Sequence, residues 1–199
     1  MIGAIVLAAG LSTRMGRPKH TLPWGETVIA RRVVDVLAES GPDEIVVVTG
    51  NAREDVEAAL RGSTARAVFN PGFANGSMLT SLQAGLRALE ESACEVALVA
   101  LGDQPQIEAG VVRAVIKQWR MNRPPILAPS FNGRRGHPIL FARSFWPHIF
   151  SASSDLSPRD LLQAHAEQVV YLAVSTDSVL RDIDTPDDYE REARVTLQT

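Results

Sequence analysis

The sequence predicts a Rossmann-like α/β fold, a three-layer sandwich in which a mostly parallel sheet carries helices on both faces. Short runs of Val, Ile, Leu and Ala recur along the 199 residues, and stretches with helical periodicity separate them. The runs show no polar alternation, which is typical of strands buried on both faces. Because no repeat or linker divides the chain, we expect a single domain over residues 1–199.

The predicted strands follow one another with room for helices between them. In chain order, the apolar runs are Ala4–Ala8, Glu44–Thr49, Ala65–Phe69, Val96–Leu101, Ile126–Ala128 and Val169–Val174. The clearest helix is Ser77–Glu91, where leucines recur on one stripe. After residue 130 a loop rich in Gly and Arg leads into a short strand, Ile139–Phe141, so we expect a C-terminal part of mixed strand direction.

Charge and composition exclude several classes of protein. Twenty basic against 23 acidic side chains give a net charge of −3, too balanced for a chain that coats nucleic acid or an anionic membrane. The apolar N-terminal segment has its basic residues behind it, the wrong order for a secretory signal, and no apolar run reaches the roughly 20 residues that span a bilayer. A single cysteine fits a reducing compartment. We therefore expect a cytoplasmic protein with no nucleic-acid or membrane partner.

A glycine-bearing loop follows the first predicted strand, at the sheet edge where ligands of open α/β sheets bind. Gly10 and Gly16 allow backbone amides to approach a phosphate closely, and Ser12 offers a hydroxyl group. Arg14 and Lys19 add positive charge. This chemistry favours nucleotide binding, and the alternative is a surface turn with solvated basic residues.

Two aspartates occupy positions suited to a metal ion. Asp103 follows a buried run and a glycine, where it can hold Mg²⁺, an ion that takes one or two carboxylates and completes its shell with water and phosphate. The alternative for Asp103 is capping of the next turn. Thr185, Pro186 and Asp188 form a helix start, which leaves Asp184 as a candidate second metal ligand.

Two further loops carry polar groups. The segment from Asn70 to Ser77 leads into the predicted helix, so its amides and the positive helix terminus can face a ligand, although capping alone also explains Ser77. The segment from Gly133 to Pro138 places two arginines and His137 on one loop, suited to a phosphate or a polar heterocycle. A solvated basic loop is the competing interpretation.

Four motifs, in this order, resemble the nucleotidyltransferases of the molybdenum-cofactor family. Leu-Ala-Ala-Gly-x-Ser-x-Arg-Met-Gly-x-x-Lys begins at Leu7, Gly-Asp-x-Pro at Gly102, Gly-His-Pro at Gly136 and Asp-Ile-Asp-Thr-Pro at Asp182. The resemblance runs from residue 2 to about residue 190 and is greatest to the cytidylyltransferase branch. The guanylyl branch has glycine where this chain has Ala9, whose methyl group narrows a base pocket against a purine.

The resemblance implies Mg²⁺-dependent transfer of CMP from CTP to the phosphate of molybdopterin or Mo-molybdopterin, with a molybdoenzyme receiving the product. It places Leu7, Ala8, Ala9, Gly10, Ser12, Arg14, Gly16, Lys19, Asn70, Gly76 and Ser81 around the nucleotide. It implies Lys19, Arg14 and Asp103 as catalytic residues, Asp103 and Asp184 as metal ligands, and Gly136, His137 and Pro138 as the acceptor loop. The alternatives are a non-catalytic carrier of nucleotide or cofactor, and a related transferase using GTP or a sugar-1-phosphate.

Overall fold

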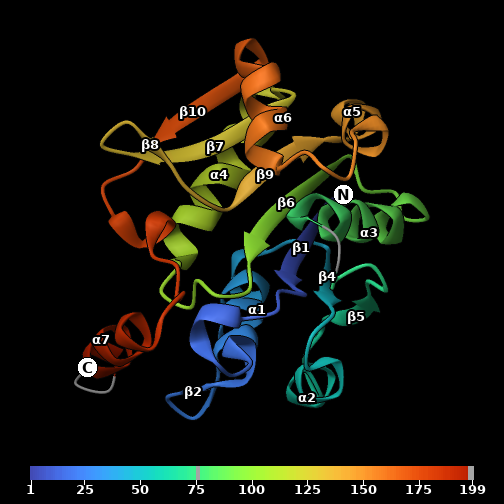
Figure 1. Cartoon of the computed structure of the whole chain (residues 1–199). Coiled ribbons are helices and arrows are strands. Elements are labelled where there is room, and N and C mark those ends of the chain that lie inside the picture. The colour runs from blue at the N-terminus through green and yellow to red at the C-terminus, as the bar shows by residue number, and fades with distance from the viewer. Residues whose placement is uncertain (75–76, 197–199) are drawn as a thin grey trace.

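The computed structural model describes residues 1–74 and 77–196, in which an eight-stranded sheet lies between helices (Figure 1). The strand order is β10-β7-β9-β6-β1-β4-β5, and β8 pairs with β7 at the side of this path. The strands are β1 (Ile2–Ala8), β4 (Glu44–Thr49), β5 (Arg66–Phe69), β6 (Val96–Leu101), β7 (Ile126–Phe131), β8 (Arg134–Arg135), β9 (Ile139–Ala142) and β10 (Val169–Ala173). The predicted fold class is confirmed.

Helical crossovers make the N-terminal half of the sheet parallel, because a parallel pair needs a long connection. The connecting helices are α1 (Ile29–Ser40), α2 (Arg53–Ala59), α3 (Met78–Glu90) and α4 (Ala109–Asn122). Strands β5, β4, β1 and β6 therefore run in one direction. Strand β9 lies antiparallel between β6 and β7, whereas β10 is parallel to β7. The expected mixed C-terminal part is confirmed.

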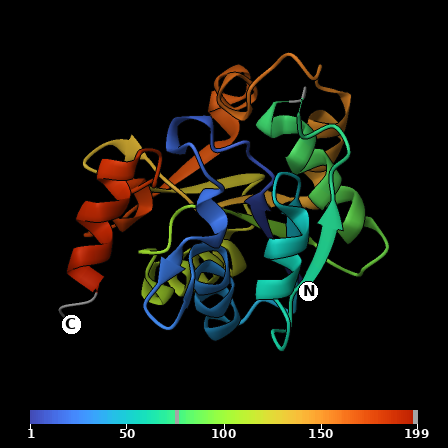
Figure 2. The ribbon, with the colours of Figure 1, turned by 60° about the horizontal axis from the view of Figure 1, so that its bottom comes forward.

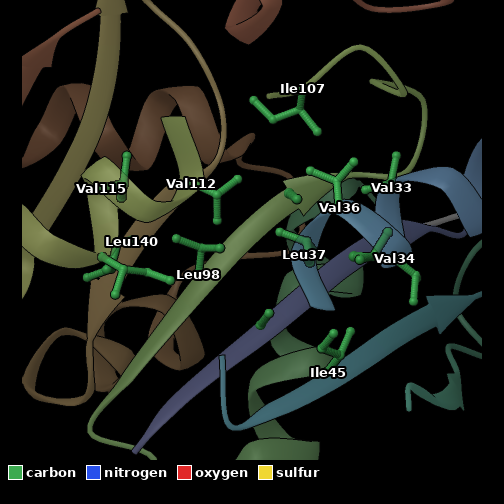
Figure 3. Packing of buried hydrophobic residues seen from close by; sticks show 14 of the residues in the cluster. Val33, Val34, Val36, Leu37, Ile45, Leu98, Ile107, Val112, Val115 and Leu140 are labelled. Atoms are coloured by element: carbon green, nitrogen blue, oxygen red, sulfur yellow. The ribbon is translucent and has the colours of Figure 1, made fainter. Parts of the chain in front are cut away.

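The two faces of the sheet bury different residues of the same strand, because successive side chains point to opposite sides. Val6 of β1 belongs to the core under α1 and α4. Figure 3 shows Leu37, Leu98 and Val112 of the same core. Ile5 joins the opposite core with α3, α5 (Trp146–Ser151) and α6 (Pro158–Ala164). Apolar side chains therefore pack against both faces of the sheet.

The structure differs from the prediction at three short strands. Strands β5 and β10 form the sheet edges and expose much of their surface instead of being buried on both faces. Strands β5 and β10 lie at the two ends of the strand order, where the helices cover less of the sheet. Strand β8 lies within the predicted arginine-rich loop and pairs Arg135 with Ser130 of β7. A two-residue strand leaves no apolar pattern to predict it from.

The chain returns to its own N-terminal segment at α7 (Pro186–Thr196), as Figures 1 and 2 show. Thr185 and Asp188 exchange hydrogen bonds at the start of this helix, which confirms the predicted cap. The Tyr189 hydroxyl donates to the Pro23 carbonyl at 2.8 Å, and Ile183 packs in one apolar cluster with Met15. These contacts hold the last motif against the loop that follows β1.

No helix in the described part of the chain combines the length and the apolar character that crossing a membrane requires.

Candidate active site

A cavity of about 310 Å³ opens at the carboxyl ends of β1 and β6, where the sequence predicts the ligand site. The residues that line it are Leu7, Ala9, Gly10, Arg14, Lys19, His20, Phe73, Ser77, Met78, Ser81, Leu101, Asp103, Asp182 and Asp184. They come from the loop after β1, the segment before and within α3, the end of β6 and the segment before α7. Segments distant in the sequence therefore form a single hollow.

Gly102 allows the ends of β1 and β6 to come together. Its N–H donates to the Leu7 carbonyl at 2.9 Å. A Cβ atom at this position would lie 2.8 Å from the same carbonyl oxygen. This contact is too short, and it could be relieved only by moving the backbone. The glycine of the Gly-Asp motif is therefore needed to place Asp103 beside the first loop.

Lys19 joins the two predicted metal ligands. Its ammonium group contacts Asp103 Oδ2, and it donates to Asp184 Oδ1 at 2.9 Å. The Arg14 guanidinium contacts the other oxygen of Asp184 at 3.0 Å. The structure thus brings together the two carboxylates and the two basic residues that the sequence assigns to one centre.

The charges in this cluster depend on one another. Burial acts to lower the pKa of Lys19, but the carboxylates of Asp103 and Asp184 outweigh it and hold that pKa above its ordinary value. Burial raises the pKa of Asp182, and the negative charge of Asp103 raises it further, although Asp182 accepts a hydrogen bond from Gln104 at 2.5 Å. The cavity is thus rich in carboxylates that need positive partners.

The donor set suits a divalent ion with an open coordination shell. Asp103 Oδ1 is buried and accepts no hydrogen bond from the described residues, so this carboxylate retains an oxygen for a cation. Within residues 1–74 and 77–196, no group of three or more histidine, cysteine, aspartate or glutamate side chains forms a metal cluster. A pair of carboxylates is the usual protein contribution to a Mg²⁺ site, in which water and substrate phosphate complete the coordination shell.

The loop after β1 is organised by its own backbone. Ser12 adopts a left-handed conformation with φ 54°, and its hydroxyl accepts the N–H of Lys19 at 3.1 Å. Gly16 is also left-handed, with φ 66°, and ends the short 3-10 helix Thr13–Met15. Ser12 and Gly16 do not line the cavity. They shape the loop that presents Lys19.

The remaining predicted nucleotide contacts fall into two groups. Leu7, Ala9, Gly10 and Ser81 line the cavity together with Arg14 and Lys19. Ala8 is buried on the opposite face of the sheet. Asn70 is also buried, does not line the cavity and acts through its neighbours. Asn70 donates to Ser81 at 3.0 Å and accepts from Gly72 at 3.0 Å, which ties the end of β5 to α3. The prediction for Gly76 lies outside the described residues.

The predicted acceptor loop lies beside this cavity but does not line it. Gly136 packs against Val179 so closely that a Cβ would lie 2.4 Å from the Val179 carbonyl oxygen. His137 donates its N–H to the same carbonyl, and a cis peptide bond joins it to Pro138. Burial lowers the pKa of His137 to about 4, against the opposing charge of Asp103. Acceptor binding by this loop stays a prediction.

Comparison with known proteins identifies the family. Residues 4–169 match the MobA-like NTP transferase domain. The chain belongs to this family of nucleotidyltransferases. The molybdenum cofactor cytidylyltransferase of Escherichia coli (strain K12) is 30% identical over 191 residues, which cover 94% of this chain and 93% of the relative.

Solved structures of the same fold agree with the MobA-like assignment. The protein Rv0371c of Mycobacterium tuberculosis superposes with a TM-score of 0.83 at 30% identity, covering 97% of each chain. A second structure of that protein, a complex with manganese, has a TM-score of 0.78 at 28% identity and covers 97% of this chain and 98% of that one. A nucleotidyl transferase from Methanothermobacter has a TM-score of 0.84 at 25% identity, over 100% and 98% of the two chains.

Sequence reasoning assigned no site role to His20, Phe73, Met78, Leu101 and Asp182, which line the cavity of this MobA-like site. His20 directly follows the first motif, and Asp182 begins the last one, so their positions alone signalled the site. Phe73, Met78 and Leu101 also line the cavity, but apolar side chains like theirs do not by themselves mark a binding site in a sequence. Their contribution depends on how α3 packs, which the sequence pattern does not specify.

Proposed function

We propose that this protein transfers CMP from CTP to the terminal phosphate of molybdopterin, releasing pyrophosphate and forming molybdopterin cytosine dinucleotide. The observation that carries the proposal is the contact of Lys19 with both Asp103 and Asp184 at the carboxyl edge of β1 and β6. The MobA-like domain supports nucleotidyl transfer, and the cytidylyltransferase relative supports CTP and the acceptor. Ala9 on the cavity wall is consistent with a pyrimidine base.

The reaction balances as an in-line displacement at phosphorus. An oxygen of the acceptor phosphate forms a bond to the α-phosphorus of CTP, while the bond from that phosphorus to the β-bridging oxygen breaks. Pyrophosphate leaves with the electron pair. Because the acceptor oxygen is already anionic, the protein need not remove a proton, and catalysis depends on positioning and charge neutralisation.

The basic residues of the cavity have two sets of possible anionic partners. Without nucleotide, Lys19 and Arg14 pair with the carboxylates. An entering triphosphate competes for these cations, and Lys19 and Arg14 move onto its oxygens and stabilise the departing pyrophosphate. This exchange frees Asp103 and Asp184 to hold Mg²⁺, which when bound neutralises phosphate charge as a Lewis acid.

Product formation with each of the four nucleoside triphosphates tests the proposal. The purified protein is incubated with Mg²⁺ and molybdopterin, and both pyrophosphate and dinucleotide are measured. We expect CTP alone to give pyrophosphate that depends on molybdopterin. A preference for GTP contradicts the proposed base, and turnover only with a sugar-1-phosphate contradicts the proposed acceptor. Tight binding of nucleotide without turnover identifies a carrier instead.

A further inference from the structure

His20 is a polar residue of the cavity that the mechanism above does not use. Its side chain lines the cavity next to Lys19 and Asp103, and the residue is only 3% exposed. Within the part of the chain that the structure describes, its ring makes no hydrogen bond, and its nitrogens are not among the side-chain atoms that are enclosed without a partner. A ring nitrogen of His20 therefore stays open to the cavity, where a ligand can become its partner.

Two glycines, which carry no side chain, approach one edge of the His20 ring. A Cβ atom at Gly102 would lie 3.2 Å from His20 Cδ2, and one at Gly10 would lie 3.9 Å from His20 Cε1. Nε2 is the ring atom bonded to both of these carbons. The edge that carries Nε2 therefore lies on the side of Gly10, which lines the cavity, and of Gly102, which follows β6.

The imidazole in this position is uncharged at neutral pH. Burial lowers the pKa of His20 to about 4; the charge of Asp103 opposes this and that of Lys19 adds to it. A neutral imidazole has one N–H donor and one acceptor nitrogen. Lys19 and Arg14 already pair with Asp103 and Asp184, so a neutral donor adds a contact to an anion without adding a third positive charge.

We propose that His20 is a substrate-binding residue whose Nε2–H donates a hydrogen bond to a phosphate oxygen of the bound nucleoside triphosphate. The inference rests on the proposed function, because the same cavity must take the triphosphate. An anion in the cavity beside Gly10 and Lys19 favours the tautomer that carries its proton on Nε2. The bound nucleotide thereby supplies the partner that the buried ring lacks.

Nitrogen-15 NMR of histidine-labelled protein tests the contact directly. On titration with CTP, and separately with inorganic pyrophosphate, we expect the His20 ring nitrogens to shift and to report an Nε2–H tautomer. His148 and His165 provide internal references, because their rings contact each other and Phe145 rather than the cavity. Saturating nucleotide that leaves the His20 resonances unchanged overturns the inference.

Paired variants separate binding from packing. We expect His20→Leu to raise both the Kd and the KM for CTP about tenfold while kcat changes less, since the lost hydrogen bond to a charged group acts before and during reaction. His20→Gln keeps an N–H donor and should retain more of the affinity. His165→Leu is the matched control and should bind CTP like the unaltered protein.

The outcomes distinguish this inference from the proposed function. CTP affinity that is unchanged in a folded His20→Leu variant overturns the role of His20 alone. If His20→Leu does not fold, the labelled protein and His20→Gln decide the question. If GTP binds and CTP does not, the His20 ring nitrogens should shift on addition of GTP, and only the proposed base is wrong. Failure of every triphosphate and of pyrophosphate to bind overturns both.

Discussion

Lys19 contacts two carboxylates at once, and this sets the charge balance of the cavity. Its side chain is 11% exposed, so solvent screens these ion pairs less than surface pairs. The motif in the sequence predicts a lysine near a phosphate. It does not predict that the lysine also compensates the acidic residues, because that requires contacts across 165 positions of the chain.

Replacing Lys19 tests its role in the reaction. We expect Lys19→Met to lower kcat on the order of 10²-fold or more, the loss typical of removing one electrostatic stabiliser of a transition state. The matched control is Lys117→Met, the same change at an exposed lysine of α4. Turnover near normal in a folded Lys19→Met protein would remove the lysine from the mechanism.

The buried histidine makes stability depend on pH at the residue scale. In the unfolded chain His20 takes up a proton near its ordinary pKa of 6.5, whereas burial holds the folded pKa at about 4. Between these values the unfolded state binds more protons, so stability falls as pH is lowered from about 6.5 to about 4. Urea unfolding at several pH values measures this, and we expect a weaker decrease in His20→Gln. An equal decrease in both proteins contradicts the account.

At the scale of elements, a substitution at the end of β6 tests how closely β6 and β1 must approach each other. Gly102→Ala places a Cβ 2.8 Å from the Leu7 carbonyl oxygen and 3.0 Å from Ala8 Cβ. We expect a loss of about 1–3 kcal/mol in the free energy of unfolding, together with reduced turnover as Asp103 shifts. The control is Gly110→Ala in α4, where a Cβ meets nothing within 4 Å. Equal stability of the two variants would contradict the packing argument.

Local elements were predictable where the sequence carried a local signal. The apolar runs predict β1, β4 and β6 because these strands are covered on both faces, and the caps at Ser77 and Thr185 follow from side-chain chemistry within one turn. The place of β9 between β6 and β7 was not predictable, since strand order depends on packing between distant segments. The same holds for His20, which lies beside Gly102 from a distant part of the chain.

At the scale of the whole molecule, the fold brings the loop after β1 and the segment before α7 to one cavity. The segment before α7 supplies Asp184, and the loop after β1 supplies Lys19 and Arg14. Because these cations occupy the carboxylates, we expect metal and nucleotide to bind cooperatively. Each ligand releases a group that the other needs.

Manganese titration followed by electron paramagnetic resonance measures this coupling. We expect Mn²⁺ to bind the free protein weakly, and a non-hydrolysable CTP analogue to tighten its binding by roughly 5-fold or more, the lower end of common coupling energies. In Lys19→Met the free protein should bind Mn²⁺ more tightly and the coupling should shrink. Identical Mn²⁺ affinity with and without the analogue contradicts the exchange of partners.

A crystal structure with Mn²⁺ and the CTP analogue tests the central claim most directly, because anomalous scattering locates the ion. The account predicts one manganese peak in contact with both Asp103 and Asp184, either directly or through its bound water, with Lys19 on the triphosphate. A bound analogue with Lys19 still on the two carboxylates, or manganese away from both aspartates, would contradict it.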